Sequence, residues 1–331
     1  MDTFYPGMHP PSSYAGGFPA SARMLASGGR PVPGPGATVA IRSAVFSLLI
    51  GVLVLALKGG AWLLTGSVAL YSDALESVIN VVAAGAAVTA LWVASRPADD
   101  NHPYGHQKAE YFSAVLEGAL IIFAALNILY SAGRELLRPQ PLEALGLGLL
   151  VSGVATLLNL FYGLYLLRIG RRLRSPALTA DGQHLLSDVV SSTGVVVGVG
   201  LVALTGWRVL DPIAAMLVAL NILWVGWRLV SRSLNSLLDE AAPPEVQTEI
   251  KRLVSTHADG ALEAHDFRTR HAGALTFIEF HLVVPGHMSV DEAHAICDRL
   301  EGIIEAQLPE SQVTIHVEPE SKAKHQGIVI V

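Results

Sequence analysis

Long apolar segments separated by short polar joints dominate the first two thirds of the chain. A bilayer core needs about 20 consecutive, mostly apolar residues for each spanning helix. Six segments reach this length, at roughly residues 40–63, 68–94, 112–136, 143–167, 179–205 and 211–230. The pattern therefore predicts an α-helical membrane protein with six transmembrane helices within residues 39–238.

The pattern changes after Pro243 and Pro244, where shorter and more polar elements begin. PEVQTEIKRLVSTH and SVDEAHAICDRLEGIIEAQL have helical periodicity, whereas ALEAHDFRTRH, LTFIEFHLVV and SQVTIHVEP are typical of strands. The predicted order of helix, strand, strand, helix, strand fits a small α+β domain whose sheet is covered by two helices. We assign this domain to residues 239–319 and a C-terminal tail to residues 320–331.

Residues 1–38 follow neither pattern and are rich in Pro, Gly, Ser and Ala. Such a segment cannot bury enough apolar surface to offset the entropy of ordering, so we predict a disordered tail. Of the 331 residues, 51% are hydrophobic and 15% are charged, which agrees with a membrane protein. The net charge of −6 argues against nucleic acid as a partner. The single cysteine, Cys297, excludes a multi-cysteine zinc site within one chain.

Lys and Arg residues are distributed unevenly over the joints, and cytoplasmic loops carry an excess of these residues. One side of the predicted membrane domain holds Arg23, Arg30, Arg42, Arg96, Lys108, Arg168, Arg171, Arg172, Arg174, Arg228 and Arg232. The opposite side holds only Arg134, Arg138 and Arg208. We therefore place both termini in the cytoplasm. A bacterial inner (plasma) membrane is expected, because the chain is compact and has no long His-rich loop.

Polar residues recur at helical spacing inside two of the apolar segments. Glu76 and Asn80 are four residues apart in the second segment, and His184 and Asp188 are four apart in the fifth. This spacing places each pair on one helix face. Ionisable groups are costly at membrane depth, and imidazole with carboxylates suits borderline divalent metals such as zinc. A metal site is the main hypothesis. A buried hydrogen-bond network and a site for ammonium or protons alone are the alternatives.

A polar loop between the second and third segments, ADDNHPYGHQKAEY, holds another group of metal-binding residue types. Asp99, His102 and His106 are spaced by three and four residues, and Pro103 and Gly105 interrupt any regular helix there. A solvated loop is the alternative interpretation. The candidate metal site formed by the two polar pairs in the membrane segments makes metal binding the favoured interpretation of this loop.

The predicted strands of the C-terminal domain carry a third group. His265 lies at the start of one strand, His281 in the middle of the next, and His316 with Glu318 on one face of the last. His294 on the second helix of the domain and Asp266 are further candidates. If the strands are neighbours, these side chains converge on one side of the sheet. The alternative is a set of surface histidines on a solvated face.

Several motifs together resemble the cation diffusion facilitator family of metal/proton antiporters over residues 40–319. They are the loop DDNHPYGHQKAE, the His184–Asp188 pair, HDFRTR and IHVEP. The resemblance implies a ferredoxin-like cytoplasmic domain and a V- or Y-shaped homodimer. It also implies a transport site, a loop site and a dimer-stabilising cytoplasmic site at the three groups above, with His294 near the last. Lys108 and Asp239 match an interlocking salt bridge between protomers.

The sequence departs from similar bacterial members at the transport site. They carry two Asp residues on the second helix, where this chain has Glu76 and Asn80. Two carboxylates neutralise a dication where three would overcompensate its charge. We therefore expect weaker binding and a shifted metal preference. Glu318 also replaces the usual Asp in the cytoplasmic site.

The expected function is efflux of Zn²⁺ from the cytoplasm by proton antiport with alternating access. H⁺ is the counter-ion, and Zn²⁺ is both the substrate and a structural ion of the cytoplasmic domain. Fe²⁺, Co²⁺, Cd²⁺ and Mn²⁺ are alternative substrates, and a membrane sensor that binds metal without transport is another reading. No enzyme is predicted, because the sequence has no HExxH motif, nucleophile elbow or phosphate-binding glycine loop.

Overall fold

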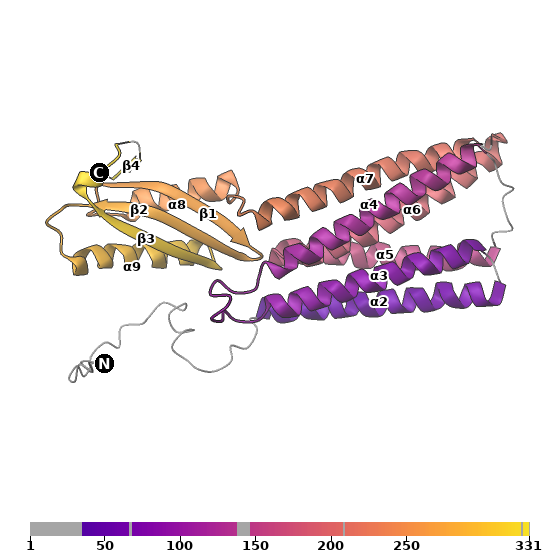
Figure 1. The fold of residues 1–331 in the computed structure, drawn as a ribbon, viewed down its shortest axis with the longest axis horizontal. Helices are drawn as coiled ribbons and strands as arrows, with labels where there is room; N and C mark the ends of the chain where they lie inside the picture. Colours follow the sequence, from indigo (N-terminus) through magenta and orange to yellow (C-terminus); the bar gives the residue numbers. More distant parts are fainter. Residues whose placement is uncertain (1–34, 66–67, 138–145, 208, 326, 331) are drawn as a thin grey trace, which may run out of the picture. The chain divides into compact units, whose positions relative to one another are not determined.

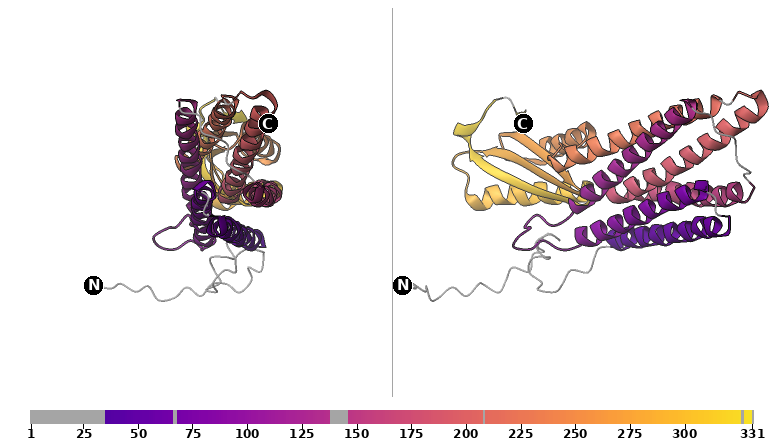
Figure 2. Two further views of the ribbon diagram at one scale, coloured as in Figure 1. Left: turned by 90° about the vertical axis from the view of Figure 1, so that its right-hand side faces the viewer. Right: turned by 45° about the vertical axis from the view of Figure 1, so that its right-hand side comes forward.

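The computed structural model describes residues 35–65, 68–137, 146–207, 209–325 and 327–330. Six long helices come first in the chain and run alongside one another (Figures 1 and 2). They are α2 (Pro35–Thr65), α3 (Val68–Ala94), α4 (Ala109–Leu137), α5 (Gly146–Leu173), α6 (Pro176–Thr205) and α7 (Leu210–Leu237). The second group of elements is α8 (Pro244–His257), β1 (Glu263–Ala272), β2 (Leu275–Val284), α9 (Val290–Gln307), β3 (Ser311–Pro319), a 3-10 turn (Glu320–Lys322) and β4 (Ile328–Val329).

The predicted helical membrane domain is confirmed. Within the described residues, five helices are long and apolar enough to cross a membrane, namely α2, α3, α4, α5 and α7. The sixth long helix, α6, carries the polar residues Asp181, His184 and Asp188 in its first half. Helix α2 begins at Pro35, which lies inside the segment that we predicted to be disordered. Proline is well suited to the first turn of a helix, which explains a start at this residue.

Small residues bring α4 and α7 close together in this domain. A Cβ atom on Gly118 would lie 2.6 Å from Cγ2 of Val230, and one on Gly226 would lie 2.9 Å from Cγ1 of Ile122. Neither position can accept a side chain without moving its neighbour. Close approach through small residues is a common packing mode of membrane helices, where apolar burial alone gives little drive for association.

The C-terminal α+β domain is also confirmed. Its sheet has the strand order β3-β2-β1-β4, with β1 antiparallel to β2 and to β4, and β2 parallel to β3. Alternate residues of β2 (Ile278, Phe280, Leu282) face α8 and α9 and form the core with them. The opposite face of the sheet carries the predicted histidines. Strand β4 lies beyond residue 319, where we expected the domain to end, and pairs with the start of β1.

Removing a core side chain of this domain should destabilise it. Leu300 on α9 is fully buried against the sheet. Leu300→Ala should therefore lower the free energy of unfolding by about 2–5 kcal/mol. Exposed Val290 on the same helix is the control, and Val290→Ala should change it by less than about 0.5 kcal/mol. Pulse proteolysis in urea, applied to the full chain in detergent, measures both. Equal midpoints for the two variants would contradict the assigned core.

Candidate metal sites

Helices α3 and α6 bring three of the four predicted transport-site residues together. The Asn80 Nδ2 donates to Asp188 Oδ2 at 2.6 Å, and the His184 Nε2 lies 2.8 Å from Asn80 Oδ1. An ionised carboxylate only accepts hydrogen bonds, so the amide nitrogen of Asn80 faces Asp188 and the amide oxygen faces His184. The His184 Nε2 therefore carries a proton in this arrangement. His184 is buried, at 4% exposure.

The fourth predicted residue, Glu76, lies on α3 one turn before Asn80. Its side chain is outside the described residues. The described site thus consists of one imidazole, one amide and one carboxylate in a continuous hydrogen-bonded chain across two helices.

Two more acidic side chains are buried in the membrane domain. Asp181 lies on α6, three residues before His184, and is 3% exposed. Glu117 on α4 is fully buried, and its carboxylate oxygens have no hydrogen-bond partner among the described residues. The two carboxyl groups interact electrostatically. Neither residue was predicted to be a ligand, although the three-residue spacing of Asp181 and His184 places both on one face of α6.

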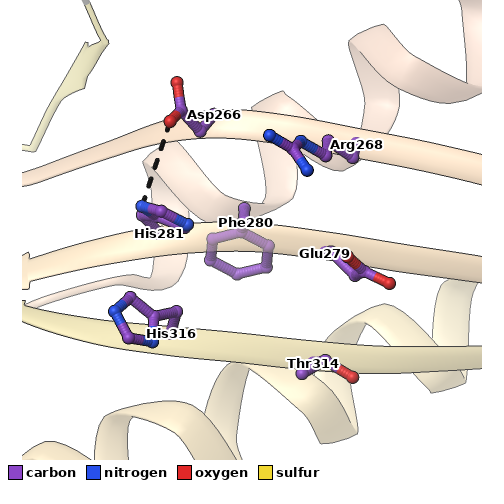
Figure 3. A pocket seen from close by; sticks show the side chains of 7 residues that line it. All are labelled: Asp266, Arg268, Glu279, Phe280, His281, Thr314 and His316. Atoms are coloured by element: carbon purple, nitrogen blue, oxygen red, sulfur yellow. Dashed lines mark ion pairs between the residues drawn. The ribbon is translucent and has the colours of Figure 1, made fainter.

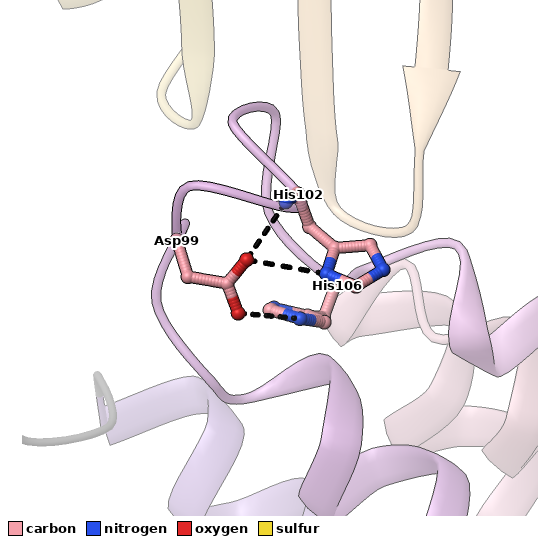
Figure 4. A group of neighbouring side chains, drawn as sticks. All are labelled: Asp99, His102 and His106. Carbon is pink, nitrogen blue, oxygen red and sulfur yellow. Dashed lines mark hydrogen bonds and ion pairs between the residues drawn. The ribbon is translucent and has the colours of Figure 1, made fainter.

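The loop between α3 and α4 folds around Asp99, as Figure 4 shows. The Oδ1 of Asp99 accepts from the backbone N–H of His102 at 2.7 Å and lies 3.2 Å from the His102 Nδ1, and its Oδ2 lies 3.4 Å from the His106 Nε2. The hydrogen bond from the His102 backbone lowers the pKa of Asp99. Gly105 provides the positive φ, 84°, that this turn requires. One ligand atom from each of the three residues lies within 4.8 Å of the others, which suits a single metal ion.

Strand register places three histidines in one row across the cytoplasmic sheet. His281 on β2 pairs with His265 on β1 and with His316 on β3. Glu318, two residues after His316, reaches back into this row. Its Oε2 lies 3.3 Å from the His265 Nε2, and its Oε1 lies 3.3 Å from the His281 Nδ1 and 3.8 Å from the His316 Nε2. The structure thus gathers these three predicted histidines around the predicted Glu318 carboxylate.

A β-bulge adds Asp266 to the same face. The β1–β2 register shifts between His265 and Arg268, and Asp266 has a positive φ of 53°. Phe267 turns to the helix-covered face, where its ring stacks on Phe280 at 5.1 Å. Asp266 turns to the histidine face instead, with its Oδ2 4.0 Å from the His281 Nδ1 (Figure 3). The sequence made Asp266 a further candidate, although regular alternation along the strand would place it on the face opposite His265. The available signal was that Asp tolerates the backbone conformation of a bulge better than most residues.

His294 does not join this cluster within one chain. It lies on α9, which packs on the other face of the sheet, and its side chain is 73% exposed. Its Nε2 lies 3.6 Å from Asp298 Oδ1, one turn along the same helix. A role for His294 at the cytoplasmic site stays a prediction.

Lys108 and Asp239 form an ion pair inside one chain. The Lys108 Nζ donates to Asp239 Oδ1 at 2.8 Å, and an Arg270 guanidinium nitrogen lies 3.3 Å from the same oxygen. The hydrogen bond from Lys108 lowers the pKa of Asp239. The resemblance implied a pair that links two protomers. Within this chain the pair joins the residue before α4 to the segment after α7. A link between protomers stays a prediction.

Comparison with known proteins adds a family to this geometry. Residues 44–238 match the cation efflux transmembrane domain, and residues 242–320 match the cytoplasmic domain of cation efflux proteins. The chain belongs to the cation diffusion facilitator family. Members of this family are transporters, so the protein is a multi-pass cation efflux transporter and not an enzyme.

Individual relatives match most of this transporter's length. An uncharacterized transporter from Synechocystis sp. is 46% identical over 276 residues, which cover 83% of this chain and 89% of that one. The cation-efflux pump FieF from Escherichia coli is 33% identical over 289 residues, which cover 86% of this chain and 95% of the pump. A solved structure of CzrB in its zinc form is 48% identical and covers 26% of this chain and 98% of that chain, with a TM-score of 0.25.

Proposed function

We propose that this transporter exports a zinc-type divalent cation from the cytoplasm in exchange for protons. The observation that carries the proposal is the hydrogen-bonded chain from His184 through Asn80 to Asp188. The nitrogen of His184 that faces Asn80 holds a proton. That proton must leave before the nitrogen can bind a cation, so cation binding and proton release are linked at one atom.

Each residue has a distinct part in the exchange. Asp188 and Glu76 supply the negative charge that offsets a dication, and His184 supplies a nitrogen ligand. Asn80 holds His184 and Asp188 in place when the cation is absent, and its amide oxygen is available as a ligand when His184 has lost its proton. Rocking of the helices then exposes the site to the opposite side. Protons from that side return to His184 and a carboxylate and release the cation.

The ligand types favour zinc over harder ions. Mg²⁺ and Ca²⁺ prefer sites made only of oxygen, whereas imidazole suits zinc and its neighbours in the first transition row. The amide Asn80 leaves the site with fewer charges than a site of three carboxylates. Fe²⁺, Co²⁺, Cd²⁺ and Mn²⁺ are the competing substrates, and their order relative to Zn²⁺ is a matter for measurement.

The two cytoplasmic groups serve binding and assembly in this proposal. The row of His265, His281 and His316 around Glu318 binds a structural divalent ion that stabilises a homodimer, and Asp99, His102 and His106 bind a further ion. The family match of residues 242–320 to a cation efflux cytoplasmic domain supports this assignment. Both termini are cytoplasmic, and the membrane is a bacterial inner membrane.

Metal uptake into proteoliposomes tests the proposal. Inverted transporters, with their cytoplasmic side outward, should accumulate Zn²⁺ when the lumen is acidic, and uptake should stop when an ionophore collapses the pH gradient. A panel of Fe²⁺, Co²⁺, Cd²⁺ and Mn²⁺ under the same gradient gives the substrate order. Binding without sustained uptake of any of these ions would replace the transporter with a sensor.

A further inference from the structure

The C-terminal segment of the chain lies beyond the part that matches the cytoplasmic domain family, which ends at residue 320. In the structure it folds back onto β1. Strand β4 pairs with Glu263 and Ala264, and the Ile330 N–H donates to the Leu262 carbonyl at 3.1 Å. The Ile330 side chain packs against the domain core. The segment is therefore docked on this edge of the sheet.

The docked segment lies against His265, at one end of the cytoplasmic histidine row. The backbone N–H groups of His325 and Gly327 donate to the buried Glu263 carboxylate at 3.0 and 3.1 Å. A Cβ atom on Gly327 would lie 2.5 Å from the Ala264 carbonyl oxygen and 2.9 Å from the His265 Cβ. Only glycine fits this approach. The segment therefore covers His265, which is 4% exposed, at the end of the row nearest β4.

Lys324 places a positive charge within the candidate metal site. Its ammonium group forms an ion pair with the Asp266 Oδ2. The same oxygen faces the His281 Nδ1, and the candidate ligand atoms of His265, Asp266 and His281 lie within 4.8 Å of one another. A carboxylate oxygen in contact with an ammonium group is a poor ligand for a dication, because the two positive charges repel each other at that distance.

We propose that Asp266 is a cation ligand of the cytoplasmic cluster. In the absence of metal, the Lys324 ammonium group holds the Asp266 carboxylate in an ion pair, and a divalent metal displaces that ammonium group when it binds. The described residues 323–325 and 327–330 then act as a strap that competes with metal for the site. The inference rests on the proposed metal binding by this cluster. Because Lys324 competes with the metal, the strap raises the metal concentration needed to occupy the cluster. Metal binding in turn breaks the ion pair of Lys324 with Asp266 and so loosens the segment from β1.

Two lysines of the segment provide a matched test. Lys324 forms an ion pair with Asp266, whereas Lys322 forms none with the described residues. Full-length protein in detergent carries Asp188→Asn in every sample, so that the transport site contributes little. Zn²⁺ affinity is measured by competition with a chromophoric chelator. Lys324→Met should bind about twofold to fivefold more tightly at low salt, the range of an exposed ion pair, and the gain should shrink at high salt. Lys322→Met should leave the affinity unchanged.

Hydrogen exchange gives a second readout that does not depend on flux. Saturating Zn²⁺ should speed amide exchange in residues 323–330, and Asp266→Asn should lower the affinity. The strap is refuted if Zn²⁺ binds through His281 and His316 while Lys324→Met leaves both affinity and exchange unchanged. Absence of any Zn²⁺ binding that depends on His281 and His316 would overturn both the strap and the proposed cytoplasmic site. Neither result bears on transport at Asp188.

Discussion

Asp188→Asn should reduce Zn²⁺ flux in proteoliposomes by at least about 100-fold. The substitution keeps the size of the side chain but removes a carboxylate that lies 2.6 Å from Asn80. Glu76 is then the remaining predicted carboxylate to offset a dication at membrane depth. Loss of one partner from a buried charge pair costs about 3–5 kcal/mol, which corresponds to about two to four orders of magnitude in binding.

Asp100→Asn is the matched control for this variant. Asp100 is an exposed residue of the loop between α3 and α4. It undergoes the same chemical change but lies outside the assigned metal ligands. Its flux should stay within about twofold of the unmodified protein, in line with the small effects of surface substitutions. Flux through Asp188→Asn at the level of this control would contradict the transport site.

The double variant His281→Ala/His316→Ala should abolish metal-dependent stabilisation of the cytoplasmic domain. Both imidazoles lie within 4 Å of the Glu318 Oε1. Their loss removes two of the three candidate nitrogen ligands and leaves His265 with the acidic residues. A ligand at 100 times its dissociation constant stabilises a folded state by about 2.7 kcal/mol. Pulse proteolysis in urea, with and without Zn²⁺ on an Asp188→Asn background, measures this difference in the full chain.

His287→Ala controls for the loss of a histidine from the same domain. His287 is exposed in the turn after β2 and lies outside the cluster. Its variant should keep the full Zn²⁺-dependent shift. If the double variant keeps that shift as well, the histidine row is only a polar sheet face, and the proposed homodimer needs another source of stability.

Helical spacing was enough to predict that residues of the two pairs meet, because both members of each pair had to lie on one helix face. The contact of Asn80 with His184 and Asp188 required only that α3 and α6 be neighbours, and the structure shows that they are. The direction of the Asn80 amide could not be predicted. The amide nitrogen of Asn80 must face an acceptor and its oxygen must face a donor. Which of Asp188 and His184 takes each part follows only from the positions of all three side chains.

Strand alternation predicted the histidine row but not its full composition. Period-two alternation along β1 assigns Asp266 to the face opposite His265. The bulge after His265 inserts one residue and reverses that assignment. Strand β4 was also missed, because two residues carry no periodic signal and its pairing depends on Glu263 and Ala264, more than sixty residues earlier. Long-range contacts of this kind are set by tertiary packing.

The ion pair of Lys108 and Asp239 shows another limit of sequence reasoning. Opposite charges at two positions predict attraction but not whether the partners belong to one chain or to two. The structure places both in one chain, where the pair joins the loop before α4 to the end of α7. The contact between protomers that the resemblance implied for this pair stays a prediction.

The most direct test of the account is the proton movement that a metal gradient drives. Proteoliposomes carry a pH dye inside, start with equal pH on both sides, and receive Zn²⁺ on the cytoplasmic face of the transporter. Exchange at His184 predicts that the lumen becomes more alkaline as Zn²⁺ enters, and that Asp188→Asn abolishes both signals together. Entry of Zn²⁺ with no change in luminal pH, when the membrane potential is clamped, would contradict proton antiport.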